Sequence, residues 1–403
     1  MTAPHISSPL LEAIDHQDEI FAKAFSVLNE AIALRAFPCA SIAVTLRENL
    51  VALKAFGHLT LEATERLSPH TIFDLASLTK VVATTSMAMV LYERGLLDLD
   101  APVAANIPEF IQDAARDPRR HEVTLRMLLT HSSGLPAYEK LFLHARTRDE
   151  LLRAAFTTPL TADPATRAEY SDIGFIILGI ALERLADESL DSFCMREIFA
   201  PLSMTNSTYN PPADLRIRIP PTADESACGA DTAFGKLRAG AVGLRPTSFA
   251  ESSVSPRSAF RGRIIQGEVQ DENAFVLGGV AAHAGLFSTA ADLAKFAHAM
   301  LSGGVPILRP ETVALFTHRE SAPVGTSRAL GWDTPSSPSQ SGEYFSPQSF
   351  GHLGYTGTSL WIDPSRQISV TLLTNRTWPD CSNQSIKRIR PTFHDAVIEA
   401  LGK

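Results

Sequence analysis

Cysteine, tryptophan and long apolar runs are scarce in this sequence. Its 403 residues include three tryptophans and four cysteines, Cys39, Cys194, Cys228 and Cys381. The cysteines form no C-x-x-C pair and no Cys/His cluster, so neither a zinc site nor a disulfide framework is indicated, and we expect free thiols in a reducing compartment. No stretch approaches the roughly 18 consecutive apolar residues of a membrane span. The acidic segment 1–25 has no apolar core of signal-peptide length.

An excess of positive charge is also missing. The net charge is −8 and the isoelectric point is near 5.9, which argues against a nucleic-acid surface because phosphate contacts need a concentrated basic patch. The H-E-x-x-H, phosphate-loop and G-x-S-x-G patterns do not occur. We therefore expect no metal and no cofactor. We also expect a cytoplasmic protein, periplasmic only if a leader was removed, that binds neither nucleic acid nor membrane.

The segment 73–80, FDLASLTK, carries the strongest chemical signal in the chain. The apolar spacing over 81–97, without Gly or Pro before Gly95, predicts a buried helix that ends at Gly95. Ser77 then lies in the first turn, where unpaired N–H groups and the helix dipole stabilise negative charge. Lys80, three residues later, shares its face. This pattern is typical of an activated nucleophile, although an isolated S-x-x-K is also explained by a surface cap and a solvated lysine.

Strand patterns occur near both ends of the chain and helical patterns in the middle. We expect an amphipathic helix over 19–36, a hairpin from 41–46 and 50–56, and strands at 349–355, 358–362 and 367–374. Helices are predicted at 124–129, 149–156, 173–187 and 190–199, with a closing helix over 383–401 that Pro391 disturbs. The Pro-, Ser- and Gly-rich segment 203–270 predicts a long loop.

This arrangement predicts an α+β fold. Its antiparallel sheet is built from both termini, residues 1–95 and 341–403, and is flanked by helices. A mainly helical lobe, residues 96–340, is inserted between them. We expect the functional site between the two lobes, where clefts form.

Three short motifs occur in order: SLTK at 77–80, YSD at 170–172 and HLG at 352–354. Their order and spacing resemble those of serine β-lactamases, penicillin-binding proteins and related esterases, the class C-like branch in particular. Connecting stretches also resemble this family, including LLTHSSGLP at 128–136 and GTSLWIDP at 357–364. The resemblance covers most of the chain. It implies a β-lactamase/transpeptidase-like fold and an acyl-enzyme on Ser77.

The residue types in these motifs suit that chemistry. Lys80 and the phenol of Tyr170 can share the removal of the Ser77 proton, because a nearby ammonium lowers a tyrosine pKa and burial lowers a lysine pKa. The resemblance implies that the backbone N–H groups of Ser77 and Tyr355 form an oxyanion hole. Gly354 suits a strand that must approach a substrate closely.

Departures from the antibiotic-degrading pattern affect the substrate-binding residues. His352 and Leu353 occupy the places of the usual lysine and hydroxyl residue, and Asp172 replaces the usual asparagine. We expect Asp172, His352 and Gly354 to contact substrate. An imidazole is only partly charged near neutral pH and a carboxylate repels an anion, so a substrate carboxylate would be held weakly. His131, Ser132 and Ser133 are expected to stabilise a turn, and His283 to pack locally.

The resulting prediction is a serine hydrolase acting on a small ester or amide, most simply a carboxylesterase. Weak hydrolysis of β-lactams or D-amino-acid peptides stays open. The alternatives are a true β-lactamase or DD-peptidase, an acyltransferase that hands the acyl group to an alcohol, and a non-catalytic binding or scaffold protein on the same fold.

Overall fold

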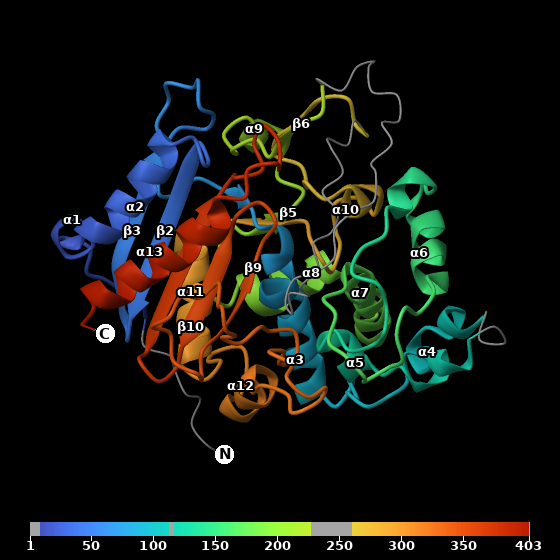
Figure 1. Cartoon of the computed structure of the whole chain (residues 1–403). Helices are drawn as coiled ribbons and strands as arrows, with labels where there is room; N and C mark the ends of the chain where they lie inside the picture. The colour runs from blue at the N-terminus through green and yellow to red at the C-terminus, as the bar shows by residue number, and fades with distance from the viewer. Residues whose placement is uncertain (1–8, 113–116, 227–259, 403) are drawn as a thin grey trace, which may run out of the picture.

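A six-stranded sheet forms one side of the molecule (Figure 1). The computed structural model describes residues 9–112, 117–226 and 260–402. The strand order is β1-β3-β2-β11-β10-β9. The strands are β1 (Leu11–Glu12), β2 (Cys39–Leu46), β3 (Asn49–Gly57), β9 (Phe350–Leu353), β10 (Ser359–Asp363) and β11 (Ile368–Thr374).

The sheet joins the two ends of the chain, as the sequence predicts. Strands β2 and β3 form the expected hairpin, with Ile42 opposite Lys54. Strand β11 pairs antiparallel with β2, which brings Val370 opposite Val44. The short β1 is an exception to the predicted antiparallel sheet, because it pairs parallel with β3.

Side chains alternate between the two faces of the sheet, and each face is buried. Ile42 and Val44 of β2 face one cluster together with α2 (Ala22–Ala33) and α13 (Ile386–Ala400). Ala43, between them, faces a larger cluster that contains the central helices. A strand exposes alternate residues to opposite faces, so a strand that is buried on both faces is mainly apolar. Strand β11, ISVTLLT, follows this rule with threonine and serine among its aliphatic residues.

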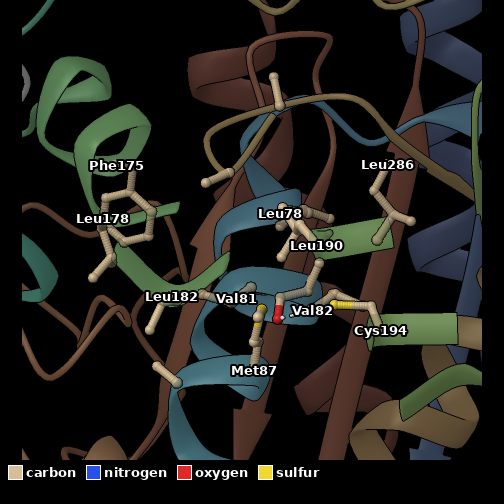
Figure 2. Packing of buried hydrophobic residues seen from close by; sticks show 14 of the residues in the cluster. Leu78, Val81, Val82, Met87, Phe175, Leu178, Leu182, Leu190, Cys194 and Leu286 are labelled. Atoms are coloured by element: carbon tan, nitrogen blue, oxygen red, sulfur yellow. Dashed lines mark hydrogen bonds between the residues drawn. The ribbon is translucent and has the colours of Figure 1, made fainter. Parts of the chain in front are cut away.

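The larger cluster also contains the segment that follows the FDLASLTK stretch. Figure 2 shows Leu78, Val81, Val82 and Met87 packed among residues of α7 (Asp172–Ala186) and α8 (Leu190–Cys194). Gly179 of α7 allows close contact, because a Cβ there would lie 2.4 Å from Cβ of Ala282. This packing fixes the position of the segment between the sheet and the helical part of the chain.

One helix of the predicted lobe 96–340 packs directly against the sheet. Helix α11 (Ala290–Leu301), inside the predicted lobe 96–340, packs against β2, β10 and β11. It therefore covers the sheet face opposite α2 and α13 (Figure 1). The lobe boundaries themselves stay a prediction.

The predicted helices form with small changes at their ends. They are α5 (Leu125–Leu129), α6 (Arg148–Thr157), α7, and α8 followed by a π-helical turn, Met195–Phe199. Helix α13 runs through Pro391 without a break, contrary to the predicted disturbance. The other helices are α1 (Gln17–Ile20), α3 (Ser86–Glu93), α4 (Val103–Asn106), α9 (Ala213–Arg216), α10 (Glu272–Val276) and α12 (Pro310–Thr317).

The predicted loop 203–270 contains short elements in its described part. Strand β5 (Thr208–Tyr209) joins β8 (Leu286–Ser288) and β4 (Phe73–Asp74) in a small sheet. Strands β6 (Ala223–Asp224) and β7 (Ile264–Ile265) pair with each other. Residues 227–259, and with them Cys228, lie outside the described residues. Within the described ranges, no helix has the length and apolar character needed to cross a membrane.

Candidate active site

The nucleophile candidate lies on an irregular turn between β4 and α3. Residues Ala76–Leu78 form a 3-10 turn, Lys80–Thr85 a π-helix, and α3 begins at Ser86. The sequence predicts one buried helix over 81–97. Its second part is confirmed as α3, which stops at Glu93 before Gly95 with a φ of +69°, whereas its first turns are π-helical. Short π-helical stretches are frequent at functional sites. The π-helix Lys80–Thr85 lies between the Ser77 turn and the regular turns of α3.

The structure brings the three predicted catalytic side chains together. Nζ of Lys80 lies 3.0 Å from Oγ of Ser77. The phenol of Tyr170 donates to the same Oγ over 2.7 Å. Tyr170 arrives from the loop before α7, 93 residues later in the chain. A serine oxygen in contact with both an amine and a phenol can exchange protons with either group.

Lys80 is buried and has three acceptors. Besides Ser77, its amine donates to Oδ1 of Asp172 over 2.7 Å and to the backbone oxygen of His283 over 2.9 Å. Burial lowers the pKa of Lys80 below its ordinary value, and the neighbouring carboxylate of Asp172 opposes this shift. The direction agrees with the sequence-based expectation for Lys80.

Tyr170 behaves differently from the prediction. Burial and the negative charge of Asp172 hold the pKa of its phenol well above the ordinary value, although the Lys80 amine lies 4.8 Å from the ring centroid. The expected lowering of the Tyr170 pKa is therefore wrong. The carboxylate that pairs with Lys80 also disfavours a phenolate nearby. Tyr170 is a neutral hydrogen-bond donor in this site.

Asp172 pairs with Lys80, a contact that the sequence did not predict. It is the first residue of α7, after the N-cap Ser171. Its side chain is 17% exposed and pairs with the fully buried Lys80. The carboxylate thus supplies the counter-charge that a buried ammonium requires. Contact with a substrate stays a prediction.

His352 lies on β9 beside Tyr170, with 5.9 Å between the ring centroids. Its Nδ1 lies 2.8 Å from the backbone oxygen of Leu353. Burial, followed by the charges of Lys80 and Arg328, holds its pKa well below the ordinary value. The expected partial charge near neutral pH is therefore wrong, because the imidazole is neutral there.

Gly354 lies where β9 meets the turn that carries Ser77. A Cβ at this position would lie 2.5 Å from the backbone oxygen of Leu75 and 1.9 Å from Oγ1 of Thr358. Only glycine allows this approach. The hydroxyl of Thr358 donates to the same Leu75 oxygen over 2.9 Å. The end of β9 is thus fastened beside the backbone of the nucleophile turn.

Tyr355 follows this glycine. Its backbone oxygen accepts a hydrogen bond from Nε of Arg376 over 2.7 Å, and its side chain is on the surface. Among the residues that the structure describes, the backbone N–H groups of Ser77 and Tyr355 donate to no protein acceptor. In this described part of the chain, neither N–H group is therefore occupied by a protein acceptor, and the oxyanion hole formed by the two groups stays a prediction.

Several residues around the site were not assigned to it by the motifs. The backbone oxygen of His283 accepts from Lys80, and the His283 ring lies 2.8 Å from Oδ1 of Asp271. The guanidinium of Arg328 lies 5.5 Å from the Tyr170 ring centroid. No local pattern marks Arg328, which precedes β9 by more than 20 residues.

His131 supports Tyr170, and its predicted role in a turn is close to what is observed. It has a φ of +57°, and its Nδ1 accepts from the backbone N–H of Ser171 over 3.0 Å. Its ring lies 4.6 Å from the Tyr170 ring centroid. His131 thus contacts the Tyr170 ring directly and binds the backbone of the next residue, Ser171.

Comparison with known proteins agrees with this geometry. A family model described as Beta-lactamase matches residues 26–389. The N-acetylmuramyl-L-alanine amidase of Bacillus subtilis (strain 168) is 31% identical over 366 residues, which cover 84% of this chain and 77% of the relative. A protein of Escherichia coli (strain K12), provisionally named a D-alanyl-D-alanine carboxypeptidase, is 31% identical over 344 residues, 81% of this chain and 74% of the relative.

Solved structures share the fold at lower identity. EstCE1, described as a hydrolase with promiscuous acyltransferase activity, superposes with a TM-score of 0.71 at 22% identity, covering 94% of this chain and 99% of its own. The octameric penicillin-binding protein homologue from Pyrococcus abyssi gives 0.65 at 24% identity, covering 95% and 77%. The fold is thus β-lactamase/transpeptidase-like, and the chain belongs to the beta-lactamase family of hydrolases.

Proposed function

We propose that this protein is a serine hydrolase that forms an acyl-enzyme on Ser77 and acts mainly as a carboxylesterase. The observation that carries the proposal is the position of the Ser77 hydroxyl, 3.0 Å from the Lys80 amine and 2.7 Å from the Tyr170 phenol. A serine is a weak nucleophile until a neighbouring base removes its proton. These contacts provide the base and a second proton carrier.

Lys80 is the base in this proposal, because burial lowers its pKa while that of Tyr170 is raised. Neutral Lys80 takes the Ser77 proton as Oγ attacks the ester carbonyl carbon. The N–H groups of Ser77 and Tyr355 bind the oxyanion of the tetrahedral intermediate. As the bond to the leaving oxygen breaks, the proton on Lys80 passes to that oxygen, directly or through the Tyr170 phenol.

Deacylation uses the same groups in reverse roles. Water attacks the acyl carbon, its proton goes to Lys80, and the proton returns to Ser77 Oγ as the acyl bond breaks. The products are one carboxylic acid and one alcohol per ester. An alcohol in place of water gives acyl transfer, which makes an acyltransferase activity the natural side reaction.

Esters are favoured because the third motif supplies no cation. His352 is held neutral by burial, and Leu353 has no hydrogen-bonding side chain. Asp172 is paired with Lys80. A carboxylate-bearing substrate finds no partner in these motifs. An alkoxide also leaves with less protonation than an amine, which suits a neutral Tyr170 with a raised pKa.

A second candidate is hydrolysis of peptides that end in a D-amino acid. One observation favours it: the Arg328 guanidinium lies 5.5 Å from the Tyr170 ring, and arginine is suited to bidentate binding of a carboxylate. The names of the relatives in Escherichia coli and Bacillus subtilis point to cell-wall peptides and amides. This candidate requires Arg328 to take the place of the missing lysine.

One set of measurements separates the candidates. Wild type and Ser77→Ala are incubated with p-nitrophenyl esters of increasing acyl length, a peptide ending in D-Ala-D-Ala, and a chromogenic cephalosporin. We expect ester turnover that Ser77→Ala abolishes, with much slower release of D-alanine. D-alanine release faster than ester turnover supports the second candidate. Rapid cephalosporin turnover indicates a β-lactamase, and a protein whose mass never increases by an acyl group is a scaffold.

A further inference from the structure

Asp74 is a buried carboxyl group that the reaction scheme does not use. It is the last residue of β4 and is only 2% exposed. Each of its carboxyl oxygens accepts from a different backbone N–H: Oδ1 from Ala76 over 2.8 Å and Oδ2 from Gln270 over 2.7 Å. A buried carboxylate is costly unless both oxygens are bound, and these two bonds meet that condition.

The first bond holds the nucleophile turn. Ala76 has a φ of +47°, a conformation that a residue with a Cβ adopts only when its surroundings impose it. Ser77 is the next residue, so the Ala76 conformation sets the direction of the Ser77 N–H and side chain. The Asp74 carboxylate is the side-chain acceptor that fixes Ala76 in this conformation.

The second bond reaches the residues behind Lys80. Gln270 precedes Asp271, whose carboxylate lies 2.8 Å from the ring of His283. The backbone oxygen of His283 in turn accepts from Lys80. The main chain of Asp74 also contacts the segment that carries the Tyr355 N–H group. Its backbone oxygen accepts from Oγ1 of Thr356, which follows Tyr355.

We propose that Asp74 is a positioning residue, whose carboxylate joins the Ser77 turn to the Gln270–Asp271 segment and so keeps Ser77 aligned with Lys80 and the oxyanion donors. This inference rests on the proposed acyl-enzyme function at Ser77. An ordinary Asx turn explains only the bond to Ala76. The bond from the second oxygen to Gln270, 196 residues away, links two segments that each carry part of the site.

The alignment should depend on the ionisation of Asp74. Burial raises its pKa to about 6, with the Asp271 carboxylate adding to the rise and the Arg261 guanidinium opposing it. Below that pH one oxygen carries a proton and no longer accepts well from a backbone N–H. The connection is therefore complete on the alkaline side of pH 6 and weakened on the acid side.

The test measures the rate at which a fluorophosphonate probe modifies Ser77, by intact mass, from pH 5 to pH 8. Asp74→Asn keeps the shape but turns an amide N–H₂ toward one of the two backbone N–H groups. We expect labelling at pH 8 to slow by roughly 10²-fold, as small misplacements of reacting groups do. Wild type should show an ionisation near pH 6 that Asp74→Asn lacks.

Asp363→Asn is the matched control. Asp363 is fully buried and accepts from the backbone N–H groups of Ser346, Ser365 and Arg366. It lies at the end of β10 away from the Ser359–Leu353 pair. Its substitution should lower thermal stability while leaving the labelling rate and pH profile of the folded protein unchanged.

The outcomes are distinguishable. Labelling of Asp74→Asn at the wild-type rate with the wild-type pH profile overturns the inference. If Asp74→Asn does not fold, the wild-type pH profile decides, and the absence of an ionisation near pH 6 overturns the inference. Labelling of wild type without turnover of any ester refutes the proposed carboxylesterase function but leaves the role of Asp74 standing.

Discussion

The phenol oxygen of Tyr170 lies 2.7 Å from Oγ of Ser77 and donates its hydrogen bond to it. Because the Tyr170 pKa is raised by burial, this donor stays neutral over the working pH range. We expect Tyr170→Phe to slow amide hydrolysis by about 10³-fold and hydrolysis of activated esters by about 10-fold, since amines need a proton to leave. Steady-state rates on a matched anilide and nitrophenyl ester check this.

The control for that substitution is Tyr209→Phe. The Tyr209 hydroxyl is buried and, within the described part of the chain, has no hydrogen-bond partner. Its removal should change neither rate. Equal losses on the anilide and the ester in Tyr170→Phe would show that the phenol does not protonate the leaving group.

The Asp172 carboxylate opposes the lowering of the Lys80 pKa. Asp172→Asn removes this charge, so the Lys80 pKa should fall further. Lys80 acts as a base only when neutral, and activity therefore rises as pH increases through its pKa. The acid limb of kcat/KM should move to lower pH in Asp172→Asn, measured with a neutral ester.

Asp100→Asn serves as the control because Asp100 pairs with Arg126 at the surface, with a side chain 68% exposed. Its acid limb should match that of wild type. If the acid limb of the kcat/KM profile of Asp172→Asn stays in place or moves to higher pH, Lys80 is not the base.

Gly354 cannot carry a side chain in the observed backbone. In Gly354→Ala, the Cβ would press on the Leu75 oxygen at 2.5 Å and on Thr358, and would push β9 away from the Ser77 turn. Loss of the Tyr355 N–H from the oxyanion site should then reduce kcat roughly 10²- to 10³-fold. Gly174→Ala is the control, because its Cβ would meet its nearest atom at 3.5 Å. Wild-type kcat in Gly354→Ala would contradict the predicted oxyanion site.

His394 links stability to pH. It is fully buried between the Ser341 backbone oxygen and Oγ of Ser359, and burial lowers its pKa to about 3. The unfolded chain takes up a proton below about pH 6.5, and the folded one does not. Stability is thus fully present above that pH and is lost as pH falls toward 3, by about 1.4 kcal/mol per pH unit.

Urea unfolding at pH 4.5 and 6.5 tests this. In His394→Gln, the difference in unfolding free energy between the two pH values should shrink by about 2 to 3 kcal/mol. His121→Gln, at an exposed position, controls for the loss of one imidazole. An unchanged difference in His394→Gln would place the pH dependence of stability elsewhere.

Local sequence patterns were sufficient to predict the parts of the structure that depend on local interactions. The hairpin of β2 and β3 and the end of α3 at Gly95 follow from side-chain alternation and from a residue that accepts positive φ. The spacing of Ser77 and Lys80 likewise lies within one helical turn. The order of the three motifs then identified the family, and the remote pairing of β11 with β2 follows from that fold.

Local sequence patterns did not predict the charge states and contact partners of the side chains in the site. Tyr170, Asp172 and His352 were each assigned a charge or contact from residue type alone. The pKa shifts of Tyr170 and His352 depend on burial and on charged groups brought near by the fold, such as Arg328, which lies far from Tyr170 in the sequence.

The sequence alone determined the fold family and which three side chains, Ser77, Lys80 and Tyr170, would meet, because the motif order and local spacing encode them. Only the tertiary structure decided that Lys80 pairs with Asp172, that His352 is uncharged, and that Asp74 joins two distant segments. The physical reason is that electrostatic energy inside a protein depends on distance and burial in three dimensions, which spacing along the chain does not specify.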